Sequence, residues 1–252
     1  MNKNSDPVSR LCVIIPTYNN AATLQQVVMD AAEYCKDIIV VNDGSTDDTK
    51  AVLERLPNTV TIVSYNKNKG KGHALVAGFR KAKELAFTHA ITMDADGQHF
   101  ASDIPTLIKA SESNPEGIIV GSRNLTEDNM PRQNTFANKF SNFWFRLQTL
   151  VNLPDTQSGF RLYCLSALRG LSFITSRYEA ELELLVFAAW AGTDVTSVPI
   201  RVYYPPEGER VSHFRPIYDF TRISILNTIL CILAIIYGYP RMALRKLRLI
   251  TS

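Results

Sequence analysis

Two carboxylates one residue apart, Asp94 and Asp96, directly follow a short apolar run at residues 90–93. A run of this length is typical of a buried strand, so the pair is expected where the chain leaves a sheet. Mg²⁺ and Mn²⁺ prefer such oxygen ligands and usually share their remaining positions with substrate phosphates. A plain turn is the alternative, because Asp and Gly are common in turns.

The segments around this motif alternate between predicted strands and predicted helices. Strands are expected at 11–15, 37–41, 60–64, 89–93 and 117–121, and helices at 21–34, 45–56, 72–86 and 102–112. Continuous apolar strands that alternate with helices indicate a parallel sheet covered on both faces, where ligands bind beyond the carboxyl ends of the strands. Polar residues follow four of these strands, at 17–19, 42–44, 94–96 and 122–123, and we expect them to converge on one cleft.

The rest of the chain adds elements of the same α/β kind and a different C-terminal end. A helix is expected at 133–151, a strand at 160–164, a helix at 181–191 and a strand at 195–204. We divide the chain into a polar leader (1–10), an α/β domain (11–215) and a C-terminal apolar helix with a basic tail (216–252).

Composition excludes several function classes. The 252 residues are 46% hydrophobic and 20% charged, which is typical of a folded globular protein. The net charge of +3 is too small to predict a nucleic-acid partner. The four cysteines show no CxxC or Cys/His spacing, so neither zinc nor a redox pair is expected.

Residues 223–239 are almost uninterrupted apolar sequence, followed by Arg241, Arg245 and Lys246. About 17 residues is the short limit for crossing the ~30 Å hydrocarbon layer of a bilayer. A basic tail favours an anionic cytoplasmic leaflet, and the polar leader lacks a signal-peptide core. We therefore expect a peripheral or monotopic helix in the cytoplasmic leaflet, or a hairpin-like segment that dips into the membrane and is completed by an integral-membrane partner. A buried or homo-oligomer-forming helix is the alternative.

Several motifs, in this order and spacing, resemble the GT-A glycosyltransferases of family 2. They are Pro16-Thr17-Tyr18-Asn19, residues 41–47, Asn68-Lys69-Gly70, residues 94–99 and Gly121-Ser122-Arg123. Residues 155–161 are similar to the SGFR segment of the dolichyl-phosphate mannosyltransferase and polyprenyl-phosphate glycosyltransferase branch. The match covers roughly residues 11–205 and implies the GT-A fold, a three-layer sandwich with a mostly parallel sheet, plus a C-terminal membrane or membrane-interface helix.

The resemblance implies a donor site for a GDP- or UDP-sugar. Pro16 and Tyr18 would border the base, and Asp43 would accept hydrogen bonds from the base or ribose. Asn20 stands where the family commonly has Glu, which leaves the nucleotide open. Lys71 would line the donor pocket, although residues 68–73 could also be a flexible turn; they lack the Walker pattern.

The same resemblance places the sugar, the phosphates and a cation around the carboxylate motif. Asp94, with Ala95 beside it, would face the ribose or sugar, and Arg123 would clamp a phosphate. Asp96 would be the main ligand of Mg²⁺ or Mn²⁺, with Asp94 and Gln98 as further ligands. Such a cation stabilises the charge that develops on a leaving nucleotide.

Family members invert the anomeric carbon by direct displacement, for which a sugar hydroxyl needs a base and a lipid phosphate needs little deprotonation. Among Asp155, Glu179, Glu181 and Glu183 we predict Asp155 and Glu181 as catalytic. A solvated helix surface is the alternative for the three glutamates.

Arg161, Arg210 and His213 would bind the acceptor phosphate, although 210–215 is also compatible with an ordinary basic loop. The predicted function is inverting hexosyl transfer from a nucleotide-sugar to a polyprenyl phosphate or related membrane lipid. The alternatives are extension of a cell-surface glycan, glycosylation of another lipid, and a catalytically silent scaffolding subunit. A nucleotidyltransferase is disfavoured, because no glycine- and lysine-rich signature follows the first strand.

Overall fold

The computed structural model describes residues 10–124, 132–170, 175–177, 179–204 and 216–251. In chain order the elements are β1 (Leu11–Thr17), α1 (Leu24–Ala32), β2 (Ile38–Asn42), α2 (Thr49–Leu53), β3 (Thr61–Ser64), α3 (Lys71–Glu84), β4 (His89–Thr92), η1 (Ala101–Asp103), α4 (Ile104–Glu112), β5 (Ile118–Arg123), α5 (Arg132–Thr149), β6 (Arg161–Cys164), α6 (Glu179–Ala191), β7 (Val195–Ile200), α7 (Pro216–Leu233), η2 (Ala234–Gly238) and α8 (Tyr239–Thr251).

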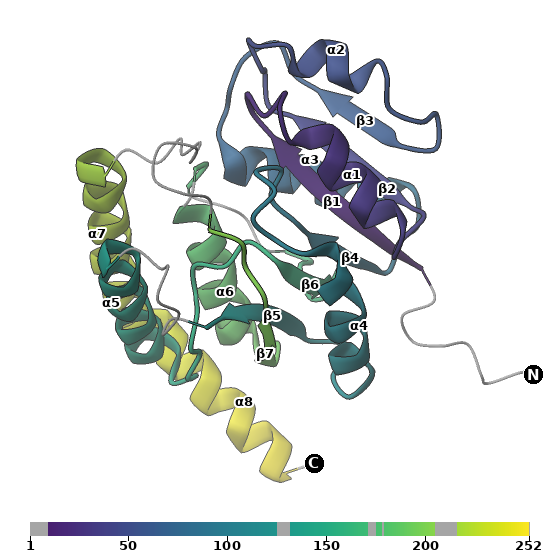
Figure 1. Cartoon of the computed structure of the whole chain (residues 1–252). Coiled ribbons are helices and arrows are strands. Elements are labelled where there is room, and N and C mark those ends of the chain that lie inside the picture. Colours follow the sequence, from purple (N-terminus) through teal and green to yellow (C-terminus); the bar gives the residue numbers. More distant parts are fainter. Residues whose placement is uncertain (1–9, 125–131, 171–174, 178, 205–215, 252) are drawn as a thin grey trace, which may run out of the picture.

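Seven strands form one sheet in the order β3-β2-β1-β4-β6-β5-β7 (Figure 1). All neighbours pair in parallel except β6, which runs antiparallel to both β4 and β5. The predicted mostly parallel sheet is confirmed. Most element bounds differ from expectation by a few residues. Among the larger differences, the strand expected at 195–204 ends at Ile200, and the helix expected to end at Leu56 covers only Thr49–Leu53.

The sheet separates two hydrophobic cores, because successive side chains of a strand point to opposite faces. In β1, Val13 and Ile15 pack into the core that α1 and α4 close, and Cys12 and Ile14 pack into the core of α3 and α6. All four side chains are fully buried. Apolar side chains on both faces of the central strands explain their continuous apolar runs, and the predicted three-layer sandwich is confirmed.

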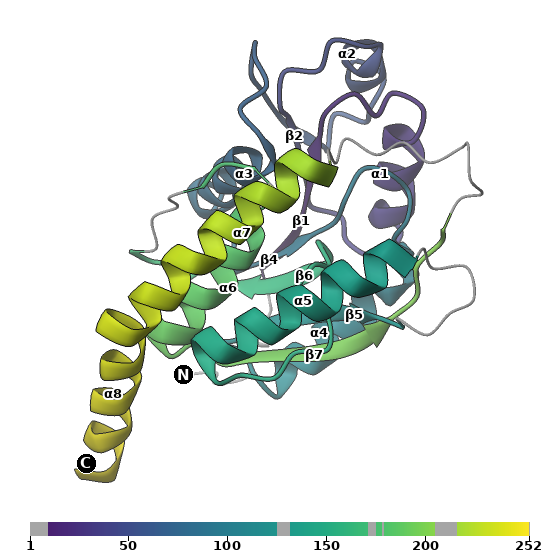
Figure 2. The ribbon, with the colours of Figure 1, turned by 90° about the vertical axis from the view of Figure 1, so that its left-hand side faces the viewer.

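Helix α7 lies against the domain, and α8 extends beyond it to the C-terminus (Figure 2). Helix α7 contacts α5 and α6, and Leu226, Leu230 and Ala234 belong to the same core as α6. A five-residue π-helical stretch, η2, joins α7 to α8. Within the described residues, Thr221–Leu247 is the one helical segment long and apolar enough to cross a membrane, by length and composition alone. The boundary predicted at residue 215 stays a prediction.

Candidate active site

The loops that follow β1 and β2 are tied together by Asn19. Its backbone N–H donates to Oγ of Ser45 over 3.0 Å, and its Oδ1 accepts from the N–H of Thr46 over 2.8 Å. Asn19 has a φ of 55°, in the left-handed region that Asn tolerates better than most residues. The Asn20 side chain donates to the carbonyl of Tyr18 over 3.1 Å. The two predicted donor residues Tyr18 and Asn20 therefore lie in a hydrogen-bonded loop. Asn19 positions this loop, a role that its place in the sequence does not predict.

Asp43, at the exit of β2, fastens the loop that precedes α3. Its carboxylate accepts from the backbone N–H groups of Lys69 (2.8 Å) and Gly70 (2.7 Å). Burial raises the pKa of Asp43, and the two backbone donors partly offset that rise. Its contact with a nucleotide stays a prediction, as does that of Pro16, which is buried within β1.

Lys71, the first residue of α3, bridges two carboxylates from distant parts of the chain. Its Nζ lies 2.7 Å from Oδ1 of Asp94 and 2.8 Å from Oε2 of Glu181. Burial alone would lower the pKa of Lys71, but the two carboxylates outweigh it and raise that pKa. A cation is unfavourable at a helix N-terminus, so the position of Lys71 is explained by these two anions rather than by helix stability.

Gly159 packs directly against this ion pair. A Cβ atom there would lie 2.7 Å from Oδ2 of Asp94 and 2.8 Å from Nζ of Lys71. The carbonyl of Gly159 also accepts from Oγ1 of Thr92, at the end of β4, over 2.7 Å. The SGFR-like segment and the carboxylate motif are therefore parts of one site.

Asp96, unlike Asp94, has no ion-pair partner among the described residues. Its Oδ1 accepts from the backbone N–H of Gln98 over 3.0 Å, while burial and then the nearby Asp94 raise the pKa of Asp96 to about 6. Among the described residues no group of three or more His, Cys, Asp or Glu side chains could hold a metal ion. The pair Asp94 and Asp96 fits the kind of Mg²⁺ or Mn²⁺ site that uses two protein carboxylates and completes its shell with substrate phosphates.

His99 belongs to the 94–99 motif and lies at the site, although the motif alone predicts no role for it. Its side chain is 6% exposed, and Nε2 lies 3.9 Å from Oδ2 of Asp94. The ring centroid is 5.2 Å from that of Phe160. Burial lowers the pKa of His99 to about 4, so the ring is neutral at pH 7. Its position five residues after Asp94 is the sequence feature that could have placed His99 at the site.

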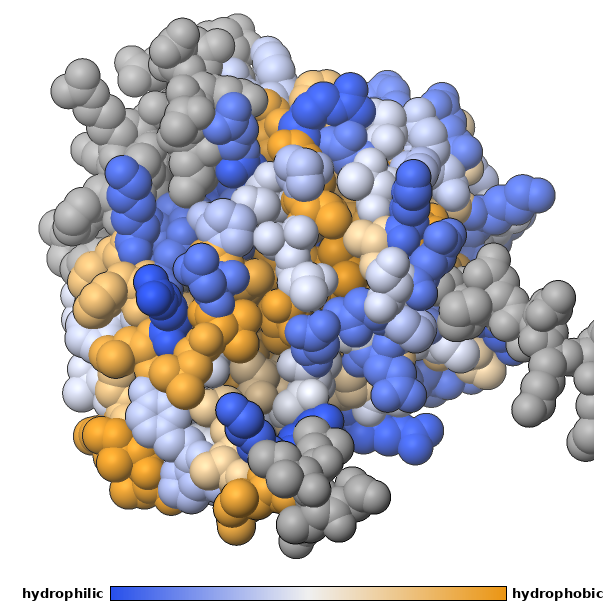
Figure 3. All heavy atoms as spheres, turned by 90° about the horizontal axis from the view of Figure 1, so that it is seen from below, coloured by the Kyte–Doolittle hydropathy of each residue, from blue (hydrophilic) through white to orange (hydrophobic). Residues whose placement is uncertain are grey.

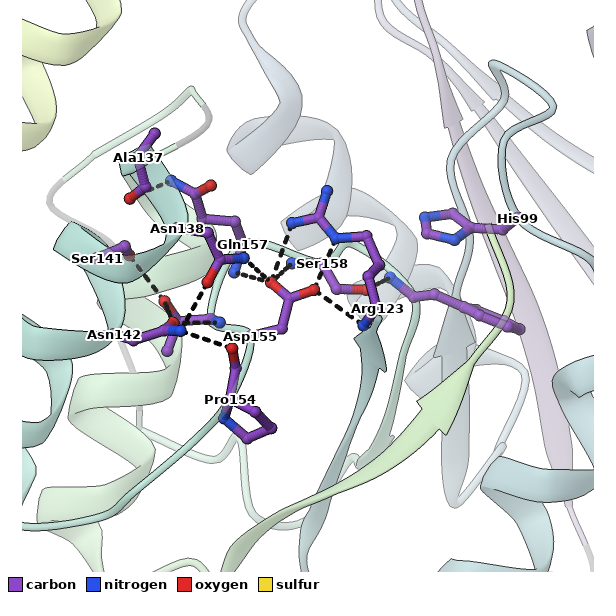
Figure 4. Close-up of polar contacts among 12 residues, drawn as sticks. His99, Arg123, Ala137, Asn138, Ser141, Asn142, Pro154, Asp155, Gln157 and Ser158 are labelled. Carbon is purple, nitrogen blue, oxygen red and sulfur yellow. Dashed lines mark hydrogen bonds and ion pairs between the residues drawn. The ribbon is translucent and has the colours of Figure 1, made fainter. Parts of the chain in front are cut away.

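Asp155 is the centre of a buried hydrogen-bond network (Figure 4). Its Oδ2 accepts from Nε of Arg123 over 2.6 Å and Oδ1 accepts from Nη2 of the same side chain over 3.0 Å. The Asn138 side chain, on α5, and the backbone N–H groups of Gln157 and Ser158 also donate to Oδ1. Burial alone would raise the pKa of Asp155, but Arg123 and the other donors hold it below its usual value.

Arg161, predicted to bind an acceptor phosphate, is fully buried and donates to protein carbonyls. Its guanidinium donates to the carbonyl oxygens of Ser158 (2.6 Å), Thr156 (2.9 Å) and Glu181 (2.8 Å). These bonds join the 156–158 turn to α6. The geometry favours a structural role for Arg161, because its donors are already used inside the protein.

The three glutamates of α6 are all buried, so the alternative of a solvated helix surface is wrong. Glu179 pairs with Arg222 on α7, and Glu183 accepts from the backbone N–H of Thr175. Glu181 differs, since its Oε2 faces Lys71 and its Oε1 has no hydrogen-bond partner within the described structure.

Two predicted acceptor residues, Arg210 and His213, lie outside the described residues. Ala95 is buried, and its carbonyl accepts from Oγ1 of Thr23, before α1, over 2.6 Å. This bond fixes the backbone between the two motif carboxylates.

Comparison with known proteins matches residues 12–171 to the family model "Glycosyl transferase family 2". Over 213 residues the chain is 34% identical to a UDP-N-acetylglucosamine–dolichyl-phosphate N-acetylglucosaminyltransferase of Methanococcus voltae, covering 76% of this chain and 85% of that relative. It is 31% identical to the polyprenol monophosphomannose synthase of Mycolicibacterium smegmatis, covering 77% of each.

A solved structure with a similar fold is the glucosyl-3-phosphoglycerate synthase of Mycobacterium tuberculosis, crystallised with Mn²⁺, UDP-glucose and phosphoglyceric acid. The TM-score is 0.61 at 17% identity, over 89% of this chain and 79% of that one. At this identity the similarity concerns the fold alone, and it agrees with the GT-A architecture.

Proposed function

The chain belongs to glycosyl transferase family 2, and from this premise we propose that it moves a sugar, with inversion, from a nucleotide-diphospho-sugar to a polyprenyl phosphate at the cytoplasmic face of the cell membrane. Transfer of a sugar is the activity of the family. The choice of a lipid phosphate as acceptor is supported by the names of two relatives, which act on dolichyl phosphate and a polyprenol monophosphate.

The main structural support for this choice of acceptor is that both predicted bases are ion-paired within the protein. Asp155 is ion-paired with Arg123, and Glu181 is ion-paired with Lys71. Arg123 and the other hydrogen-bond donors hold the pKa of Asp155 below its usual value, which makes Asp155 a weak general base. Oε2 of Glu181 is occupied by the ammonium group of Lys71. A sugar hydroxyl requires a general base, whereas a lipid phosphate is already an anion. The pairing therefore favours a phosphate acceptor.

On the donor side, we propose that Lys71 and Arg123 attract the diphosphate and that Asp43 and Tyr18 contact the nucleotide. Asp94 and Asp96 would hold a divalent cation, with Gln98 as a further oxygen ligand. When bound there, Mg²⁺ or Mn²⁺ supplies positive charge that stabilises the leaving nucleotide diphosphate. The raised pKa of Asp96 supports this assignment, because it reports negative charge that the protein alone leaves poorly compensated.

The test uses the full chain with labelled GDP-mannose, UDP-glucose or UDP-N-acetylglucosamine, Mn²⁺ and undecaprenyl phosphate. We expect one donor to give label that enters the organic phase and is released by mild acid, as expected for a sugar phosphodiester. Undecaprenol, which lacks the phosphate, is the matched control and should accept no sugar. If no donor yields extractable label, or if undecaprenol serves equally well, the proposed acceptor is wrong.

A further inference from the structure

We propose that the exposed sides of α5, α7 and η2 form one membrane-contact face, which lies flat on an anionic lipid bilayer without crossing it. We define this face by Phe143, Leu147 and Leu150 of α5 and its C-terminal end, and by Ile229, Ile232 and Ile236 of α7 and η2. The inference rests on the proposed membrane acceptor and adds which surface meets the lipid and in what orientation.

The six side chains form two stripes at helical spacing. Residues three or four apart share one face of a helix, which is the spacing of the three residues from α5 and of the three from α7 and η2. Phe143 is 60% exposed, and Ile232 and Ile236 are 56% and 66% exposed. Figure 3 shows apolar surface concentrated on its left-hand side, the side where α5, α7 and α8 lie in Figure 1. Large exposed apolar patches mark interaction surfaces.

The opposite sides of the same helices are fixed to the domain. Nε2 of Gln148, on α5, donates to Oδ1 of Asn227, on α7, over 3.0 Å, and both residues are buried. Leu226 and Leu230 pack into the core beside α6, which carries buried glutamates. A helix that crossed the bilayer would draw these charged side chains into hydrocarbon, where they are costly. The packing therefore favours a helix that lies in the interface, with only its isoleucine side in lipid.

The charge of these segments identifies an anionic bilayer as the partner. The chain has 24 Asp and Glu residues, yet none occurs in residues 132–149, and Asp219 near the start of α7 is the one acidic residue in 216–252. Lys139, Arg146, Arg241 and Lys246 are exposed in these segments. A second copy docked through the same face would bring like charges together, since a two-fold interface pairs a surface with itself. Anionic headgroups complement this surface instead.

Leu150 provides an independent observation. It directly follows the last residue of α5 with a φ of 63°, in the left-handed region that is unfavourable for a branched side chain, and it is 73% exposed. Neither the backbone conformation nor the exposure is favourable in water. Contact with lipid would remove the second cost, and Leu150 is therefore the most informative residue to change.

The first experiment measures flotation of the full chain with vesicles of phosphatidylcholine alone or with phosphatidylglycerol. We expect binding to the anionic vesicles that weakens in high salt. Leu150→Glu and Ile232→Glu should each weaken vesicle binding at least 10-fold. Met29→Glu is the matched control, because Met29 is 46% exposed on α1, on the other side of the sheet, and should bind as the wild type does. If Leu150→Glu binds normally, or if the chain dimerises through this face and ignores vesicles, the proposal is wrong.

The second experiment separates a flat helix from a spanning one. Fluorophores at Ile225→Cys and Ile236→Cys, with Cys35 and Cys231 replaced by Ser, are quenched by lipids brominated at known depths. Eleven residues of helix span about 16 Å, so a spanning helix places the two labels at depths that differ by about that amount, whereas a flat helix gives equal, shallow depths. Unequal depths overturn the proposal.

A third measurement keeps this inference apart from the proposed function. Sugar transfer to a water-soluble, short-chain prenyl phosphate needs no bilayer, so Leu150→Glu and Ile232→Glu should transfer sugar to it as the wild type does. If the wild type transfers nothing to either acceptor but still binds vesicles, the proposed function fails and the membrane-contact face stands. If transfer to the soluble acceptor proceeds and vesicles are not bound, the reverse holds.

Discussion

Lys71 and Glu181 form an ion pair of 2.8 Å that joins the start of α3 to the buried side of α6. Because Lys71 also lies 2.7 Å from Asp94, one ammonium compensates two carboxylates. The loss of that cation leaves both anions without a partner, whereas the loss of Glu181 leaves Lys71 still paired with Asp94. The three residues therefore act as a unit, in which the loss of Lys71 leaves more charge unpaired than the loss of Glu181.

The first prediction concerns this unit. Lys71→Met should lower the free energy of unfolding by roughly 1–3 kcal/mol, the usual cost of leaving buried polar groups unsatisfied, and Glu181→Gln should lower it by less. The double variant should lose less stability than the sum of the two single losses, because Glu181→Gln removes an anion that Lys71→Met leaves unpaired. Urea denaturation of the four proteins measures the coupling. Additive losses would show that the two residues are energetically independent.

The second prediction concerns the metal-free protein and Asp96. Its pKa in the folded state, about 6, lies above the unfolded value of about 3.9, so the folded state binds the extra proton between these values. Stability therefore falls as the pH rises through this window. In EDTA, Asp96→Asn should be more stable than the wild type at pH 7, by roughly 1–2 kcal/mol after allowance for partial exposure, and equally stable below about pH 4.

Asp96→Asn should also lose most of the stabilisation that Mn²⁺ and the nucleotide-sugar give to the wild type. With Mn²⁺ and the cognate nucleotide-sugar at 100 times its Kd, the wild type should gain ~2.7 kcal/mol of stability, and Asp96→Asn should gain far less. Thermal shift with and without Mn²⁺ measures both. Equal shifts in the two proteins would exclude Asp96 as the main metal ligand.

The third prediction concerns Asp155, whose pKa is shifted in the opposite direction. A folded-state pKa below the unfolded value contributes stability that is complete above about pH 4 and is lost as the pH falls through the folded pKa. Asp155→Asn leaves the Arg123 guanidinium without its anion and should cost roughly 3–5 kcal/mol at pH 7. This difference from the wild type should shrink as the pH falls below 4. Glu84→Gln, at an exposed ion pair with Lys81, is the control and should change stability by less than ~0.5 kcal/mol at either pH.

The layers and the donor motifs could be predicted from the sequence because each depends on a local pattern. Apolar runs such as 38–41 are buried on both faces of the sheet, and this continuity distinguishes a central parallel strand. The carboxylates at 94 and 96 follow their strand directly, so the order of residues alone locates them at its end. The antiparallel insertion of β6 between β4 and β5 has no such local signature, because strand order depends on contacts between distant segments.

The partners of the ionisable residues were harder to predict for the same reason. Spacing separates Glu181 from Glu179 and Glu183 on the helix, but all three are buried, each with a partner from a different segment. Asp155 and Arg161 belong to one motif and are both buried, and only the fold reveals that their polar atoms are used inside the protein. Sequence position suggested which residues lie at the site, and the packing decides which of them remain available to a ligand.

The fourth prediction separates function from stability with two glycines. At Gly72 a Cβ would lie 2.3 Å from Cβ of Ala180, inside the contact between α3 and α6, so Gly72→Ala should cost roughly 1–3 kcal/mol of stability through overpacking. At Gly159 the atoms in the way are the ends of the Asp94 and Lys71 side chains, which can move. Gly159→Ala should therefore fold normally but bind the nucleotide-sugar at least 10-fold more weakly.

Gly170→Ala is the control for backbone strain alone, because Gly170 has a φ of 73° and no described atom lies within 4 Å of the added Cβ. It should lose about 1 kcal/mol of stability and keep its donor affinity. Denaturation and nucleotide-sugar titration with Mn²⁺ on all three variants give the two readouts. If Gly159→Ala loses stability as Gly72→Ala does while its donor affinity is unchanged, then the close approach of the 158–161 segment to Asp94 is a packing feature. If affinity falls and stability holds, that approach sets the position of the ion pair that meets the donor.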